Sequence, residues 1–246
     1  MQTKSIIFLA VLLFLTQCNI PKIKIENTID PDIVLVNLES IDRASIGKLL
    51  LKINIAKPKL IVIDAYFQNE KEINQDSTLI SALSTVKNDI LIYTNTSENK
   101  LLYSHSKFRK YAIDEGLNEF DEDNNLISRM TPVAKIEDQI HQLIPLKIVK
   151  HWKPEFNHDF KVDKSIPIVF SRTLNQFVHF TSSEIDDVDE KVLQNKIVIV
   201  GYLGPGNEDK HFTPLRFVED HPENEPDTYG PVIIANAVRT ILVYDN

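Results

Sequence analysis

The fold is decided by residues 33–63, which read IVLVNLESIDRASIGKLLLKINIAKPKLIVI. Two runs of aliphatic, mostly β-branched residues, 33–36 and 60–63, are typical of parallel strands that are covered on both faces. Between them, Asp42 can cap a helix whose apolar residues recur at helical spacing. A strand, a helix and a second strand at this pitch predict a right-handed crossover within a parallel sheet.

The alternation of buried-looking strands and amphipathic helices continues along the chain. A helix from Asp76 or Ser77 to Val86 leads to a third strand at 90–93, and a last buried strand is predicted at 197–200. Residues 94–132 are polar and irregular. The remaining predicted elements are a short helix at 108–113, a helix at 136–152 that is interrupted or restarted at Pro145, strands at 166–170 and 177–180, a helix from a capping box at Ser183 and Asp186 to Leu193, and a closing helix at 233–244.

These patterns predict one α/β domain over residues 32–246, with a mainly parallel central sheet and helices on both faces. The formal net charge of −8 argues against nucleic acid as a partner, because nucleic-acid-binding proteins present basic surfaces. It also argues against docking on anionic lipid beyond an anchor. The only cysteine is Cys18, so disulfides, thiolate metal sites and cysteine nucleophiles are excluded from the domain.

The N-terminal 18 residues resemble an export signal. A short basic start precedes the apolar run 6–15, which is too short for a membrane-spanning helix of about 20 residues. Leu15 and Thr16 ahead of Cys18 resemble the lipobox of bacterial lipoproteins, although Gln17 stands where small residues are usual. We expect lipidation at Cys18; an uncleaved anchor and cleavage without lipid are the alternatives. All three place the rest of the chain outside the cytoplasm, with residues 19–31 as a tether.

Acidic residues follow two of the predicted strands. Glu39 lies just past the first strand, Asp64 ends the second, and Asp42 starts the intervening helix. In open α/β sheets, ligands bind at the carboxyl ends of strands, next to helix N-termini. We therefore predict that these residues belong to one polar ligand site. The alternative is that Glu39 is a loop carboxylate and Asp64 a hydrogen-bonding strand terminator.

The loop after the last buried strand is rich in glycine. It holds Gly201, Gly204 and Gly206, which are three of the six glycines in the chain. Glycine permits positive φ and a close approach of the backbone to a ligand. No helix begins inside this motif, so a Rossmann-type phosphate site is rejected. A ligand-facing loop and a tight structural turn both fit; on the first reading, the three glycines and Asp209 join the candidate ligand-binding residues.

Motifs for metal binding or catalysis are weak. Residues 209–223 are dense in histidine and acidic residues but lack a recognised ligand spacing, which favours a solvated acidic loop. Residues 121–125 imitate the start of an EF-hand, but Leu126 replaces the required glycine and Pro132 the bidentate glutamate. Neither a Gly-x-Ser-x-Gly elbow nor a His-Glu-x-x-His helix occurs. We therefore expect no metal, no cofactor and no catalytic residue.

Several segments, none specific alone, occur together in a characteristic order. They are Asp32–Val36, Pro58–Asp64 with Phe67, Asn195–Gly201, Asp209 through Leu215, Tyr229–Val232 and Ala235–Ala237. The set resembles the type-2 CHASE domain, an extracytoplasmic sensory module of bacterial histidine kinases, nucleotide cyclases and related receptors. Members of that family usually continue into three membrane helices and a cytoplasmic output domain, which this chain does not show. The resemblance therefore implies extracytoplasmic recognition rather than direct transmembrane signalling.

These observations predict an extracytoplasmic sensory domain that is tethered to a membrane and binds an unidentified small ligand. We expect it to act through a membrane or envelope partner protein that contacts the closing helix around Arg239. One alternative is a metal-assisted hydrolase that uses Asp64 with Asp209 or His211. A second alternative is a structural subunit of an envelope complex without a small ligand.

Overall fold

The computed structural model describes residues 24–98, 100–218, 222 and 224–244. The predicted signal peptide, Cys18 and part of the acidic stretch after residue 218 lie outside these described residues. The described chain is built around one central sheet. Its strands are β1 (Ile33–Asn37), β2 (Leu60–Ile63), β3 (Asp89–Asn95), β4 (Leu101–Leu102), β5 (Asp114–Leu117), β11 (Val178–Thr181) and β12 (Ile197–Gly201).

The sheet is mostly parallel, as predicted. Its order is β11, β1, β12, β2, β3 and β5, with every neighbouring pair parallel. Only β4 is antiparallel, where it pairs with the end of β3. The last strand in sequence, β12, lies between β1 and β2, which are separated by a single helix in the chain. The strands predicted at 33–36, 60–63, 90–93, 177–180 and 197–200 are therefore present in this sheet, whereas the one predicted at 166–170 is only Ile166–Pro167 and lies outside it. The sheet order differs from the chain order because β12 pairs between β1 and β2.

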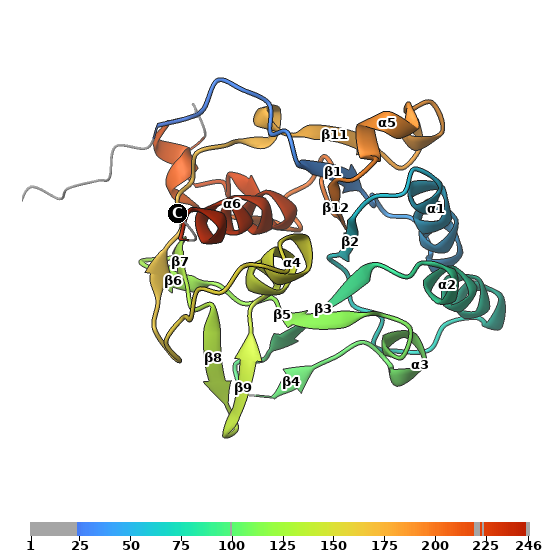
Figure 1. Cartoon of the computed structure of the whole chain (residues 1–246), viewed down its shortest axis with the longest axis horizontal. Coiled ribbons are helices and arrows are strands. Elements are labelled where there is room, and N and C mark those ends of the chain that lie inside the picture. Colours follow the sequence, from blue (N-terminus) through green and yellow to red (C-terminus); the bar gives the residue numbers. More distant parts are fainter. Residues whose placement is uncertain (1–23, 99, 219–221, 223, 245–246) are drawn as a thin grey trace, which may run out of the picture.

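Helices cover both faces of the sheet (Figure 1). One face carries α1 (Arg43–Ile55), α2 (Ile73–Thr85), α3 (Ser106–Arg109) and α5 (Glu190–Leu193). The other carries α4 (Ile144–Trp152) and α6 (Gly230–Val243). Side chains of β1 alternate between the two layers, Val34 facing the first and Leu35 the second, because successive residues of a strand point to opposite faces.

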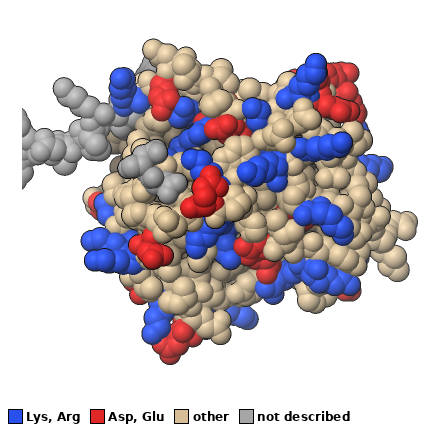
Figure 2. All heavy atoms as spheres, viewed as in Figure 1, with Lys and Arg blue, Asp and Glu red and all other residues tan. Residues whose placement is uncertain are grey.

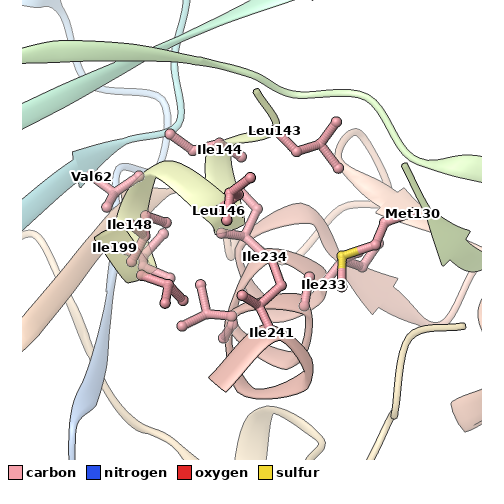
Figure 3. Packing of buried hydrophobic residues seen from close by; sticks show 14 of the residues in the cluster. Val62, Met130, Leu143, Ile144, Leu146, Ile148, Ile199, Ile233, Ile234 and Ile241 are labelled. Carbon is pink, nitrogen blue, oxygen red and sulfur yellow. The ribbon is translucent and has the colours of Figure 1, made fainter. Parts of the chain in front are cut away.

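The layer under α4 and α6 is closely packed. Val62 of β2 and Ile199 of β12 meet Ile148 of α4 and Ile234 of α6 there, and none of the four is exposed (Figure 3). Burying such side chains contributes about 1.5–3 kcal/mol each. This packing holds the two helices against the sheet. Both helices run from the carboxyl edge of the sheet toward its amino edge.

The predicted helix over 136–152 is only half correct. Its first part forms an antiparallel hairpin of β8 (Val133–Ile136) and β9 (Gln139–Gln142), joined through Glu137 and Asp138, whose φ angles are 48° and 62°. Two central residues with positive φ are typical of a type I′ hairpin turn. Helix α4 then begins at Ile144 with Pro145 in its first turn, where the missing N–H is not needed.

Other parts of the chain differ from the prediction as well. The polar segment 94–132 contains β6 (Asp121–Asp123) and β7 (Leu126–Met130), which form a small antiparallel sheet with β10 (Ile166–Pro167). The capping-box helix predicted from Ser183 is instead a 3₁₀ turn at Glu184–Asp186 followed by α5. The Glu184 carboxylate accepts from the Thr181 backbone N–H (2.7 Å) rather than capping a longer helix.

The remaining elements are short. Two 3₁₀ turns, Leu174–Gln176 and Pro214–Phe217, and the hairpin of β13 (Lys210–His211) with β14 (Thr228–Tyr229) complete the described fold.

The segment expected to be a tether is partly fixed to the domain. Asp30 is completely buried and accepts from Arg239 of α6, and Arg172 pairs with both Asp30 (3.3 Å) and Glu26. Arg239 also pairs with Asp32 (3.0 Å). Arg239 therefore stabilises the fold, and a partner contact around this residue stays a prediction.

Candidate functional site

The carboxyl ends of β1, β12 and β2 form the centre of the candidate site. The chain leaves β1 and β2 toward α1 and α2 on one face, whereas it leaves β12 toward α6 on the other. Neighbouring strands whose connections diverge to opposite faces leave a crevice between them, and ligands of open α/β sheets bind there. The insertion of β12 thus creates a topological switch point next to Asp64.

Asp64 lies half-buried directly after β2. Its backbone N–H donates to Val200 O of β12 (2.8 Å), and Asn118 Nδ2 donates to its Oδ1 (3.0 Å). Burial raises the pKa of Asp64 to about 7, and the negative charge of Asp209 adds to the rise, while His211 opposes it. Asp64 therefore changes charge near neutral pH, which is uncommon for a carboxyl group.

Asp209 and His211 reach Asp64 from a distant part of the sequence. His211 lies in β13, and the Gly230 backbone N–H donates to Asp209 O (3.0 Å), which attaches this segment to the start of α6. His211 Nε2 lies 3.8 Å from Asp209 Oδ1, and this contact is the main cause that raises the pKa of His211. Two carboxylates and one imidazole are thereby gathered at one strand end.

Tyr66 completes the cluster. Burial raises its pKa to about 12, and the nearby charge of Asp64 acts in the same direction. The side chains of Thr94 and Asn118, at the ends of β3 and β5, act on this pKa in the opposite direction. The ends of β12, β3 and β5 therefore contribute polar groups to the surroundings of Asp64.

Gly201 is the glycine of the loop with a clear steric reason. A Cβ at this position would lie 2.6 Å from Pro231 Cγ and 3.1 Å from Asp64 Cβ, so only glycine allows β12 to approach both. At Gly204 and Gly206, a Cβ would meet the side chains of Tyr202 and Glu208. All six glycines are described and none has a positive φ, so the loop does not use that freedom.

Glu39 and Asp42 have their contacts elsewhere at this edge. Glu39 has a φ of 50°, and its Oε2 accepts from Ser182 Oγ (2.8 Å), next to β11. Asp42 caps α1 by accepting from the Ser45 backbone N–H (2.8 Å), as its position in the sequence predicted. The structure thus brings together Asp64, Gly201 and Asp209, and it gives Glu39 and Asp42 partners outside that cluster.

Three residues of the site were not singled out from the sequence. Asn118 and Tyr66 carry no motif, and their role depends on which strands lie side by side. Asn37 is buried, and its Oδ1 accepts from Glu39 N (2.9 Å) and Leu203 N (2.8 Å), which joins the loops after β1 and β12. A polar residue directly after four apolar strand residues was the only available signal for Asn37.

The comparisons with known proteins identify the family. A family model described as the CHASE2 domain matches residues 26–246. The chain belongs to the CHASE2 domain family. No curated protein and no solved structure matches the chain. CHASE2 domains are extracellular sensory domains, which gives this chain a sensory role and agrees with a position outside the cytoplasm.

Further features of this CHASE2 domain bear on its chemistry. Among the described residues, no group of three or more His, Cys, Asp or Glu side chains is placed to hold a metal ion. In the same part of the chain, no helix is long and apolar enough to cross a bilayer. Acidic and basic side chains are interspersed over the face viewed in Figure 2.

Proposed function

We propose that this CHASE2 domain is an extracytoplasmic sensor that binds a small ligand at Asp64 and acts through a partner protein. The observation that supports this most is the position of Asp64, a half-buried carboxyl group at the switch point of the sheet. Asp209, His211, Tyr66 and Asn118 surround it. Carboxylates in such a place accept hydrogen bonds, so a ligand with N–H or O–H donors, such as an amine or an amide, fits best.

The same geometry offers a route for a response. Gly201 contacts Pro231 at the start of α6, and Asp209 is bonded to Gly230 one residue earlier. A ligand that prefers one arrangement of the loop after β12 would therefore shift the position of α6 as well. A ligand changes a conformational equilibrium only by its difference in affinity for the two states, so the partner must distinguish them.

A thermal-shift screen of the purified protein with small amines, amino acids and amides tests the site. We expect a ligand that raises the melting temperature of the wild type and of Asp138→Asn, whose side chain is 94% exposed, but not of Asp64→Asn. Val198→Ala should unfold more easily, by about 1–4 kcal/mol, because it truncates a buried strand residue. If Asp64→Asn lowers the melting temperature as much as Val198→Ala does, Asp64 is structural.

The partner is tested by photo-crosslinking in intact cells. A photoreactive residue in place of Val243, which is 59% exposed at the end of α6, should capture one dominant envelope protein. The same residue in place of Ile73, which is 86% exposed at the start of α2, serves as the control. Equal capture at both positions, or none at either, would contradict a partner on the closing helix.

Membrane attachment through Cys18 completes the proposal. Several acyl chains give stable attachment, whereas one chain binds membranes only marginally. Mass spectrometry of the mature N-terminus should find lipid on Cys18, and Cys18→Ser should leave the membrane fraction. A Cys18→Ser protein that still fractionates with membranes after leader cleavage would favour a different anchor.

The two alternative functions have less support. A metal-assisted hydrolase needs ligands for the cation, and the described residues offer no suitable group of three. A structural subunit would not need a carboxyl group with a raised pKa at the switch point. Stabilisation by a ligand without turnover would separate the sensor from both.

A further inference from the structure

We propose that this protein has a second binding site, at the amino edge of the sheet, that takes a small carboxylate attached to an apolar group. The site is a cavity of about 480 Å³ between the ends of α4 and α6 and the segment that precedes β1. The strands are parallel, so this edge lies opposite Asp64 and the inference does not depend on the proposed function. Small-molecule sites typically measure about 300–1,000 Å³, a range that includes this cavity.

One wall of the cavity is apolar. It is formed by Trp152 at the end of α4, Val169, and Leu242 and Val243 at the end of α6. Val169 and Val243 remain 55% and 59% exposed. An aliphatic or aromatic group in the cavity would remove these side chains from water, at about 25 cal/mol per Å² of apolar area.

The described charged groups around the cavity leave one cation, Lys153, without an acidic partner. The guanidinium groups of Arg172 and Arg239 are paired with Glu26, Asp30 and Asp32. Lys153 also lines the cavity, and no carboxylate of the described residues lies within ion-pair distance of its Nζ. The three cations Arg172, Arg239 and Lys153 thus equal the three acids in number, but Lys153 takes part in none of these ion pairs.

The unpaired cation selects the ligand class. A single negative charge would pair with Lys153, whereas a cationic ligand would have to compete with the arginines for their carboxylates. Charge-assisted hydrogen bonds from an ammonium group to a carboxylate are roughly twice as strong as neutral ones. The apolar wall next to Lys153 then selects carboxylates that carry an aliphatic or aromatic group over acetate.

Trp152 makes the site directly observable, because it is the only tryptophan in the chain. Its ring lies in the cavity wall, with Lys59 Nζ 4.8 Å from the ring centroid. Titration of the purified protein with octanoate below its micelle concentration should change the Trp152 emission saturably. Acetate at the same concentrations should have little effect.

Variants locate the carboxylate. Lys153→Ala should weaken octanoate binding roughly 10- to 100-fold, as expected for the loss of a charged hydrogen bond, and Lys153→Arg should largely restore it. Lys150→Ala, which removes an exposed lysine on the same helix, and Asp64→Asn should leave the affinity unchanged. Circular dichroism checks that each variant is folded.

Two further probes separate the sources of the signal. Octylamine has the same chain with the opposite charge and should not bind. Phosphatidylglycerol vesicles present anionic headgroups on a surface and should not change the emission. A non-saturable response to octanoate, equal binding of octylamine, a response to vesicles alone, or an unchanged affinity of Lys153→Ala would each overturn the proposal.

Discussion

At the scale of single residues, Asp64 carries the most information. Its carboxyl group is held by Asn118 and faces the charge of Asp209, and burial in this setting raises its pKa to about 7. Asp89 is the useful comparison, because burial raises its pKa to about 7 as well, yet it lies at the amino end of β3. The two carboxyl groups thus share a titration range but not a location.

The raised pKa of Asp64 predicts how stability depends on pH. A carboxyl group whose pKa is raised in the folded state stabilises the fold fully below its unfolded pKa of 3.8, and this contribution is lost as the pH rises through 7. As the pH rises from 4 to 8, the free energy of unfolding of Asp64→Asn should therefore increase relative to that of the wild type, by on the order of 2–4 kcal/mol. Urea unfolding at several pH values measures this change.

Asp89→Asn is the matched control for that prediction. It should flatten the same pH dependence, because Asp89 is completely buried, but it should leave any ligand response at the carboxyl edge intact. Asp64→Asn should change both the pH dependence of stability and the ligand response. If the free energies of unfolding of Asp64→Asn and the wild type differ by the same amount at every pH in this range, Asp64 is not desolvated as described.

At the scale of elements, the ends of helices and strands decide what each predicted site residue does. Asp42 was expected both to cap a helix and to contact a ligand, and its contact in the fold is the cap of α1. Gly201 ends β12 where the first turn of α6 approaches. Asp42 thus stabilises the N-terminus of α1, and Gly201 permits β12 and α6 to come into contact.

Asp42→Ala should cost about 1 kcal/mol, because it removes the side-chain acceptor for the Ser45 N–H. Chemical denaturation measures the loss. Asp42→Ser should recover most of it, since serine is an equally good cap. A loss of ligand response in Asp42→Ser, with stability restored, would instead give Asp42 a direct role in binding.

Gly201→Ala should destabilise the fold by about 1–3 kcal/mol, because the added methyl group would lie 2.6 Å from Pro231 Cγ. The double variant Gly201→Ala with Pro231→Ala should recover part of that loss, since the two sites are in contact and their effects are not additive. Gly204→Ala should cost less, because the Tyr202 side chain can move away. Equal costs at both glycines would contradict this steric account.

At the scale of the whole molecule, ion pairs connect the two ends of the described chain. Asp30, ahead of β1, is buried against Arg239 of α6 and Arg172 of the loop before β11. This network attaches residues 26–32 to the closing helix, so the chain that leads from the predicted anchor enters the domain next to α6. A change in the position of α6 would therefore affect the segment that precedes β1.

Arg239→Ala should destabilise the protein by about 3 kcal/mol, because it leaves the buried Asp30 with one partner fewer. Limited proteolysis should then cut earlier within residues 24–32. Lys52→Ala removes an exposed pair with Asp186 and should cost less than about 1 kcal/mol. Equal unfolding free energies for the two variants would refute a structural role of Arg239.

The sequence by itself determined the class of the fold and the position of its main strands. Hydrophobic periodicity is local, so 33–36, 60–63, 90–93 and 197–200 could be identified as buried strands and Asp64 placed at a strand end. The same local signals failed at 136–143. Apolar residues recur there at 136, 140 and 143, which is helical spacing, yet the segment belongs to a hairpin. The hairpin turn depends on positive φ at Glu137 and Asp138, which composition does not reveal.

Only the tertiary structure decided which strand ends meet. The pairing of β12 with both β1 and β2 joins segments separated by well over a hundred residues, and nothing in the local sequence of either segment specifies it. That pairing brings Asp209 and His211 to Asp64 and creates the switch point. Strand pairing depends on contacts across the whole core. The sequence therefore indicated a site at the strand ends, but only the fold determined which residues meet there.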